Sequence, residues 1–483
     1  MINYSSIRND MASLPSDHDA SGDHKPTVDE IFAPKQHANA LDPYTTIVVG
    51  ARGTGKSFWA GVLSQEETLK VAAESYPDLG LDKIVVAEGY NGFISSRILE
   101  QVIPSGQESS MAVSFWQAAI VKAAEECLAP NKTKKKMSDY IKKYSDPEGL
   151  DIYLNKLDNK LQAKNITLVI TFDALDKLSK EWSRSTLILD ALFEVVWDLR
   201  IRKAIKAKIF IRPEQLNDEN LKFVEMPKLR SSRVELEWTQ LELYGLLFSR
   251  LAYTYDNSDF QELCKSIGAP FIKLPYKQRT NWDVLSNKDF QKKTMTALAG
   301  PYMGANFKKG GTYDWPYKHL ADANGNVTPR SFIKLFSEAA KHTPEPQNKV
   351  ISPEGIRHGL REASKVRVDQ LGIEYVWVKR ALAPLAGLRV PCAAEEIYTR
   401  WKDSNTIKVI MDASKDPISG FLPPYPFKTQ KIKYPEDTAA LAESMVNIGL
   451  IEHRQDGRID IPDLFRVAAL MLKKGGITPK AKR

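Results

Sequence analysis

The chain has 483 residues, of which 43% are hydrophobic and 27% are charged, and its formal net charge is +8. These proportions are close to those of globular proteins, so they exclude a chain that is disordered throughout. No apolar run approaches the roughly 18 residues of a membrane span, and the first residues lack the apolar stretch of a secretory signal. We therefore expect a cytoplasmic protein of roughly two to four domains that has no membrane partner.

Strand and helix patterns alternate along the first half of the chain. Residues 1–28 are rich in Ser, Asp and His, and they predict a disordered leader. Apolar runs predict strands at 45–49, 83–87, 167–172, 207–211 and 234–238, and apolar spacing predicts helices at 111–127 and 185–203. The run at 167–172 (TLVITF) is apolar on both faces, which is typical of a covered parallel sheet. Thr239 and Glu242 form a capping box that predicts the start of a further helix.

The segment after the first predicted strand is rich in glycine. It reads Gly50, Ala51, Arg52, Gly53, Thr54, Gly55, Lys56, Ser57, which matches GxxxxGK(S/T) between a strand and a helix. Glycines let the backbone wrap around phosphates, so that successive N–H groups face the anion. We expect Lys56 to reach the β and γ phosphates and the Ser57 hydroxyl to bind Mg²⁺. The sequence therefore predicts a P-loop that binds ATP with Mg²⁺, in a doubly wound α/β domain.

Two acidic residues follow the apolar strand at 167–172. Asp173 stands directly after the strand, where a carboxylate beside the P-loop holds Mg²⁺ through water. Motor-type ATPases often carry Glu at the next position, but this chain has Ala174. The next acid is Asp176, which is our candidate for polarising the attacking water, with an ordinary surface acid as the alternative.

Three arginines lie beside the later strands. Arg212 follows the strand at 207–211, where its side chain can approach the γ-phosphate and report its presence. Arg230 and Arg233 precede the last strand, from which an arginine can project as a finger toward the nucleotide of a neighbouring subunit. Ion pairs within the chain are the alternative for these two arginines.

The order of these motifs resembles that of a known family. GARGTGKS, LVITFDALD, KIFIR and VELEWTQLEL are similar to the motifs of additional-strand P-loop ATPases, especially the signal-transducing STAND and KAP-like branches close to AAA+. The resemblance covers roughly residues 30–340. It implies that Arg212 ends a sensor strand, and that Arg330 in NVTPRSFIKLF is a lid arginine that contacts nucleotide. Pro329 independently suits the first turn of a helix, because its missing N–H costs nothing there.

The sequence departs from the family's pattern in ways that bear on function. The absence of Glu after Asp173 fits slow turnover, and an insertion at 257–306 interrupts the lid. We find no internal repeat, so a sensor or effector would be a separate protein. The expected parts are a leader (1–28), a P-loop core (29–240), a helical lid with insertion (241–345) and a winged-helix-like C-terminal domain (346–483).

The C-terminal domain is expected to contain a hairpin. LIEHRQDGRIDIP predicts two short strands joined through Asp456 and Gly457, after a predicted helix at 436–449. Basic residues that could meet DNA phosphates are Arg454, Arg458, Lys473, Lys474, Lys480 and Lys482. Against DNA recognition, the helix at 436–449 is acidic and apolar, and a packing role is the alternative.

A lysine-rich segment is the second candidate for a nucleic-acid contact. Its lysines are Lys132, Lys134, Lys135, Lys136, Lys142 and Lys143. Because no aromatic residues are interleaved among the first four, a solvated loop is the alternative.

Three functions are compatible with these motifs. The favoured one is a slowly hydrolysing ATPase that acts as a nucleotide-dependent switch, as a homo-oligomer and/or with a separate effector protein. For this function the resemblance implies a setting such as bacterial antiphage defence. The alternative is a DNA-binding ATPase that uses the winged helix and basic segments. The third is a P-loop kinase of small molecules, which the additional strand and the lack of a short arginine-rich lid disfavour.

Overall fold

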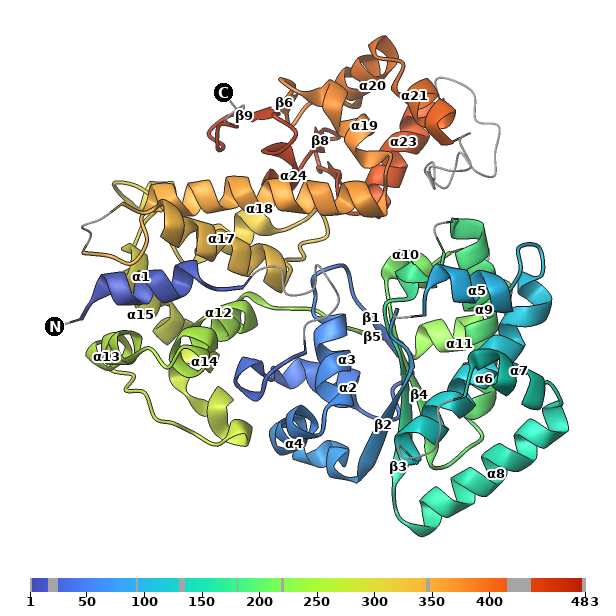
Figure 1. Cartoon of the computed structure of the whole chain (residues 1–483). Helices are drawn as coiled ribbons and strands as arrows, with labels where there is room; N and C mark the ends of the chain where they lie inside the picture. Colours follow the sequence, from blue (N-terminus) through green and yellow to red (C-terminus); the bar gives the residue numbers. More distant parts are fainter. Residues whose placement is uncertain are drawn as a thin grey trace. The chain divides into compact units, whose positions relative to one another are not determined.

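The computed structural model describes residues 2–15, 25–92, 94–129, 135–179, 181–218, 221–344, 348–414 and 436–479. The chain forms two compact units. The sheet unit comprises residues 18–237 and 274–280, and the helical unit comprises residues 1–17, 238–273 and 281–483 (Figure 1). Within the described residues, no helix is both long enough and apolar enough to cross a membrane.

A five-stranded parallel sheet forms the centre of the sheet unit. Its strands are β1 (Ile47–Val49), β2 (Ile84–Tyr90), β3 (Thr167–Phe172), β4 (Ile205–Ile211) and β5 (Val234–Glu235), in the spatial order β2-β3-β4-β1-β5. All five predicted strands are confirmed, although β2 and β4 are longer and β1 and β5 are shorter than expected. Strand β4 therefore lies between β3 and the P-loop strand β1. It is the additional strand that the order of the motifs implies.

Helices cover both faces of this sheet (Figure 1). On one face, α3 (Lys56–Ser64) and α4 (Glu66–Ser75) pack with Val48 and Phe210. On the other face, α6 (Glu108–Leu128) and α9 (Trp182–Leu199) pack with Ile47 and Val49. Side chains alternate between the two faces because the strand period is two residues. The predicted doubly wound α/β arrangement is confirmed.

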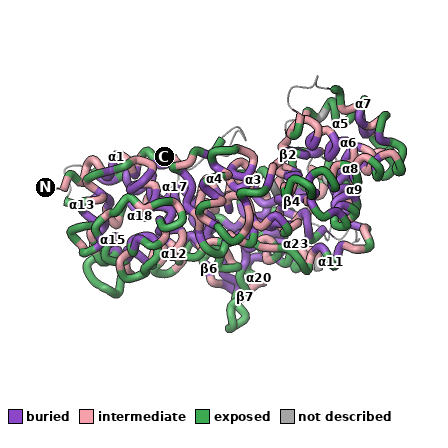
Figure 2. Tube along the Cα trace, turned by 90° about the horizontal axis from the view of Figure 1, so that it is seen from below, coloured by how far each residue is buried: buried purple, intermediate pink, exposed green. Residues whose placement is uncertain are grey.

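Further elements complete the sheet unit. They are η1 (Val28–Glu30), η2 (Lys35–His37), α2 (Ala38–Leu41), η3 (Pro77–Leu79), η4 (Leu81–Lys83), α5 (Ser96–Val102), α7 (Met137–Lys143), α8 (Pro147–Ala163), η5 (Leu175–Lys177), α10 (Pro213–Leu216) and α11 (Met226–Ser231), and η7 (Tyr276–Asn281) ends at its boundary. Figure 2 shows the buried residues in the interior of the fold and the exposed residues around them.

The segment of the helical unit that starts at residue 238 opens with the helix that the capping box predicts. Thr239 accepts a hydrogen bond from the Glu242 N–H at 3.3 Å, and the Glu242 carboxylate accepts one from the Thr239 N–H at 2.8 Å. This box starts α12 (Gln240–Ser249). The elements that follow are η6 (Arg250–Thr254), α13 (Ser258–Ser266), α14 (Asp283–Ser286), α15 (Lys288–Ala299), η8 (Phe307–Lys309), α16 (Asp314–Leu320), α17 (Pro329–His342) and α18 (Pro353–Glu374).

The prediction of a disordered leader is wrong for its first residues. Tyr4–Ala12 forms helix α1, which is capped by the Asn3 side chain. Ile7 and Met11, one helical turn apart, are fully buried, and the Arg8 guanidinium donates to the Val350 carbonyl at 2.8 Å. Apolar burial and this capped start stabilise a helix that composition alone does not predict. Residues 16–24 of the leader lie outside the described residues.

The C-terminal part is built from short helices and short strands, and its winged-helix-like character stays a prediction. Its elements are α19 (Val378–Leu382), η9 (Ala383–Leu385), β6 (Arg389–Val390), α20 (Ala394–Asp403), α21 (Thr406–Ser414), α23 (Glu436–Asn447), β7 (Glu452–His453), β8 (Ile459–Asp460), α24 (Asp463–Arg466) and β9 (Leu472–Lys473). The predicted hairpin is confirmed, since β7 pairs antiparallel with β8 and Gly457 adopts a φ of 80° in the turn. Cys392, just after β6, pairs with Ile459 and adds a third strand segment.

Candidate nucleotide-binding site

The loop from Gly50 to Ser57 connects β1 to α3 and depends on its glycines. Gly53 and Gly55 have φ values of 84° and 101°, which side chains rarely tolerate. A Cβ atom at Gly50 would lie 2.4 Å from the Thr54 hydroxyl oxygen, so this position also requires glycine. The Thr54 hydroxyl donates to the Ala51 carbonyl at 2.8 Å and closes the loop. The local sequence thus fixes the shape that the motif predicts.

Lys56 begins α3 and folds back over the loop. Its ammonium donates to the Gly50 carbonyl at 2.6 Å and to the Ala51 carbonyl at 3.1 Å. The loop itself is tied to the neighbouring strand, because the Gly50 N–H donates to the Ile211 carbonyl at 3.1 Å. A positive charge, the first amides of a helix and a glycine loop therefore meet at one point, which suits an anion.

Asp173 lies at the carboxyl end of β3, beside the start of α3. Its N–H donates to the Tyr90 carbonyl at 2.8 Å, and its carboxylate lies near two potential hydrogen-bond donors, the Ser57 hydroxyl and the Ala174 N–H. Burial raises the pKa of Asp173, while these donors and the charge of Lys56 lower it. A half-buried carboxylate and a hydroxyl are oxygen ligands of the kind that Mg²⁺ takes, so the pair fits the ion expected from the sequence.

The backbone conformation and the packing at Ala174 disfavour a glutamate at this position. Ala174 has a φ of 54°, in the left-handed region. A Cβ atom placed on Gly92 would come within 3.0 Å of the Ala174 Cβ and 2.8 Å of the Lys177 Cδ. The side chain at position 174 therefore lies against the loop after β2. A longer acidic side chain there is disfavoured, because the backbone is in the left-handed region and the space around the Cβ atom is crowded.

Asp176 and Arg212 are brought together by the fold. Their side chains form an ion pair, with the Arg212 Nη2 2.7 Å from the Asp176 Oδ2. Arg212 follows β4 and is mostly buried, with a side-chain exposure of 13%. Because β3 and β4 are neighbours, residues just beyond their carboxyl ends meet at the same edge as the P-loop. The candidate water-polarising acid and the candidate sensor are therefore one coupled pair.

The remaining candidate arginines lie in different settings. Arg230 donates to the Leu216 carbonyl at 2.9 Å and to the Asp218 carbonyl at 3.1 Å, which ties α11 to the segment after α10. Arg233 pairs with Glu235 at 3.0 Å and its side chain is 41% exposed. Arg330 belongs to the helical unit, where it follows Pro329 in the first turn of α17. The sheet unit alone therefore builds the site from the P-loop, Asp173, Asp176 and Arg212.

Tyr90 is a residue of this edge that the sequence analysis missed. It ends β2, and its ring packs against Trp116 with centroids 5.8 Å apart. Its hydroxyl is buried and has no hydrogen-bond partner among the described residues. Burial, and then the charge of Asp176, raise the pKa of Tyr90. The available signal is an aromatic residue, Tyr90, three positions after the apolar run that ends at residue 87.

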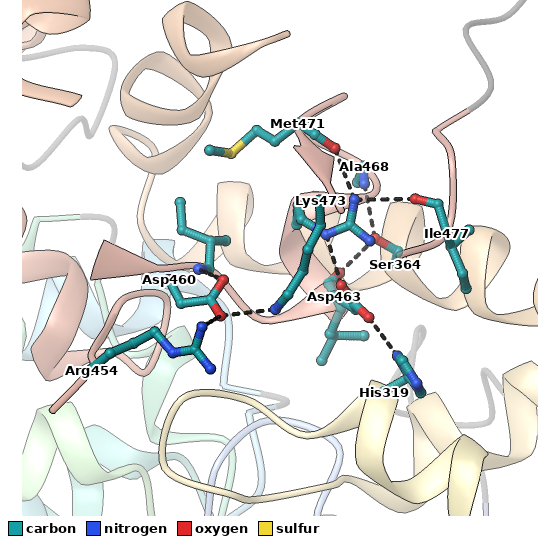
Figure 3. A network of polar contacts seen from close by, with 12 residues as sticks. His319, Ser364, Arg454, Asp460, Asp463, Ala468, Met471, Lys473 and Ile477 are labelled. Atoms are coloured by element: carbon teal, nitrogen blue, oxygen red, sulfur yellow. Dashed lines mark hydrogen bonds and ion pairs between the residues drawn. The ribbon is translucent and has the colours of Figure 1, made fainter. Parts of the chain in front are cut away.

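The basic residues of the C-terminal hairpin are largely neutralised within the hairpin region. Lys473 lies 2.8 Å and Arg454 3.9 Å from the same carboxylate oxygen of Asp460 (Figure 3). Arg458 pairs with Asp456 at 2.7 Å. Of the other predicted contacts, Lys132, Lys134, Lys480 and Lys482 lie outside the described residues. The hairpin region is therefore a weak candidate for phosphate contacts, because its basic side chains already lie beside carboxylates.

The solved structures that resemble this chain include an Orc2 protein and a Cdc6p. No protein-family model and no curated protein matches the sequence. The Orc2 protein of Aeropyrum pernix, solved as ADPNP–ADP complexes, is 13% identical over 93% of this chain and 94% of its own, with a TM-score of 0.44. Cdc6p of Pyrobaculum aerophilum is 14% identical over 93% of this chain and 95% of its own, with a TM-score of 0.33. At these low values, the fold assignment rests on the sheet order and the P-loop.

Proposed function

We propose that this chain binds ATP with Mg²⁺ at the P-loop of the sheet unit and hydrolyses it slowly. The observation that carries the proposal is the meeting of Ser57 and Asp173, which come from distant parts of the sequence and lie close enough for the Ser57 hydroxyl and the charge of Lys56 to act on the Asp173 carboxylate. A P-loop without the acid would be a weaker indication, because the acid is what holds the metal in this chemistry.

Each residue of the site has a part in this proposal. Amides of residues 50–57 and the Lys56 ammonium would bind the phosphates, and Lys56 would exchange its bonds to the loop carbonyls for phosphate oxygens. Ser57 and Asp173 would hold Mg²⁺, which supplies charge neutralisation at the phosphates when bound. Arg212 stabilises the negative charge of Asp176 at the same edge. To orient a water, Asp176 would have to share its carboxylate between Arg212 and that water.

The geometry also supports slow turnover. Position 174 holds no acid, and the Asp176 carboxylate is engaged in an ion pair with Arg212. Slow hydrolysis suits a switch, because the protein stays in its ATP-bound conformation until the nucleotide is hydrolysed. We infer that the chain regulates a partner, either further copies of itself or a separate effector. A setting in antiphage defence stays a prediction from the family resemblance.

The experiment is to measure ATP affinity and hydrolysis of Lys56→Ala against Lys83→Ala. Lys83 is exposed in the same unit, so its variant is the matched control. We expect Lys56→Ala to lose ATP binding by at least about a hundredfold, since a charged phosphate contact is removed from a desolvated site, while Lys83→Ala binds like the wild type. Undiminished affinity in a folded Lys56→Ala variant would refute the proposed site.

A further inference from the structure

A cavity of about 310 Å³ lies at the opposite edge of the sheet from the P-loop. Its walls come from the residues before β1, the end of α9, the start of β4 and the turn before β5. The polar residues that line it are Tyr44, Thr45, Thr46, Arg200, Lys206 and Ser232. Two cations and four hydroxyls line this cavity, and no described carboxylate does. Such a lining suits an anion.

Basic side chains lie over aromatic rings at two places along this edge. The Lys206 ammonium lies 5.6 Å from the centroid of the Tyr44 ring, and the Arg200 guanidinium lies 4.4 Å from that of Trp197. Lys228 approaches the same Trp197 ring at 5.6 Å. We name these five residues the basic–aromatic strip. The cavity lies between the two groups, because Arg200 and Lys206 both line it.

The charges of the strip are only partly compensated. Lys228 pairs with Glu225 at 2.5 Å. Lys206 donates to the Arg202 carbonyl at 2.6 Å and has no ion pair closer than 4 Å among the described residues. Burial lowers the pKa of Lys206. The positive charge of Arg200 also lowers this pKa, whereas the negative charge of Asp158 raises it. The two cations at the cavity thus repel each other, and a bound anion would relieve that repulsion.

The exposed ring of Tyr44, at the end of the strip, indicates which kind of anion would bind. Tyr44 is 68% exposed, although it is large and partly apolar. An aromatic face beside cations is the arrangement by which proteins hold single-stranded nucleic acid, with bases on the rings and phosphates on the cations. A duplex keeps its base faces stacked and offers none to Tyr44.

We propose that the basic–aromatic strip binds single-stranded nucleic acid. Arg200 and Lys206 hold neighbouring phosphates at the cavity, and a base stacks on Tyr44. Strand β4 spans seven residues between this edge and Arg212, which is about 20 Å at the usual rise per residue. The strip is therefore separate from the nucleotide site, and both can be filled at once.

The test is the binding of a fluorescently labelled oligothymidylate to the full chain over a salt series. Wild type is expected to bind with an affinity that falls as salt rises. An Arg200→Gln/Lys206→Gln double variant should bind roughly tenfold or more weakly, with a salt slope reduced by about 1.4 for two lost phosphate contacts. Tyr44→Ala should also bind roughly tenfold more weakly, with little change of slope, because stacking is lost and charge is kept.

Matched controls separate this site from general charge and from the P-loop. Lys156→Gln/Lys160→Gln, on the exposed side of α8, removes the same charge from the same unit and should leave binding unchanged. Lys56→Ala should retain oligonucleotide binding, and the strip variants should retain ATP binding. The proposal is overturned if wild type shows no salt-dependent binding or if the strip double variant binds like the control. Equal binding of duplex and single strand, unaffected by Tyr44→Ala, would overturn the single-strand assignment.

Discussion

His37 is a buried histidine whose two ring nitrogens both take part in hydrogen bonds. Its Nδ1 accepts from the Trp59 indole N–H at 3.2 Å, and its Nε2 donates to the Glu237 carbonyl at 2.8 Å. Only the neutral ring can do both, because the protonated ring has no acceptor. Burial lowers the pKa of His37 to about 4, with the Glu237 contact opposing this shift.

The stability of the sheet unit should therefore depend on pH through His37. In the unfolded chain this histidine gains its proton near pH 6.5, whereas in the folded chain it stays neutral down to about pH 4. The stabilisation is present above pH 6.5 and is lost as the pH falls toward 4, by up to about 3 kcal/mol. Urea unfolding of wild type and His37→Gln at several pH values measures this. The wild type should lose more stability than the variant across this window, and parallel curves would contradict the assignment.

Single residues of the site differ in how far the sequence could predict them. Lys56 and Ser57 could be placed because a contiguous motif fixes the loop around them. Asp173 could be placed because an apolar strand ends there. The ion pair of Asp176 with Arg212 could not, since it depends on which two strands are neighbours. Nor could the capping contacts of Arg230, because they depend on the path of the chain after α10.

At the scale of elements, Lys208 joins β4 to the segment that enters β1. Its side chain is fully buried, and its ammonium donates to the carbonyls of Ala40, Asp42 and Thr45 at 2.8 to 2.9 Å. Burial lowers the pKa of Lys208 to about 7, while three carbonyls favour the form that has three hydrogens to donate. The lysine thus fixes the start of the strand that carries the P-loop.

Lys208→Met should destabilise the sheet unit by about 3 kcal/mol, because three buried carbonyls lose their donor. Urea unfolding at pH 7 measures the loss, and Lys83→Met is the exposed control, for which no significant change is expected. A Lys208→Met variant as stable as this control would show that the carbonyls find other partners and that the lysine is dispensable.

Elements with a strong local pattern could be predicted, and those stabilised by distant contacts could not. Strand β3 agrees with its prediction at both ends because its apolar run is unbroken. Strand β5 is limited to two residues, since the chain leaves the sheet after Glu235. Helix α1 was missed because its stability comes from burial of Ile7 and Met11 in the helical unit, which composition does not reveal.

For the molecule as a whole, the predicted functional residues are distributed between the two units. The sheet unit contains every residue of the candidate site except Arg330. The lid and C-terminal residues lie together in the helical unit, and the boundary expected between them at residue 346 stays a prediction. A switch that acts through oligomers needs a residue that reports across subunits. Arg233 suits this better than Arg230, because its side chain is 41% exposed while Arg230 is bound to its own chain's carbonyls.

Mixing variants tests whether Arg233 acts on a neighbour's nucleotide. We expect ATP to shift the chain to a larger species in size-exclusion chromatography, and Arg233→Ala to assemble but hydrolyse at least tenfold more slowly, since arginine fingers contribute on the order of 10³ or more. Lys56→Ala alone should be inactive, yet it carries an intact Arg233. If Lys56→Ala subunits retain the ability to assemble, mixing them with Arg233→Ala subunits should restore part of the turnover, because each intact P-loop then faces an intact arginine. Full turnover in Arg233→Ala alone would assign that arginine to its pair with Glu235.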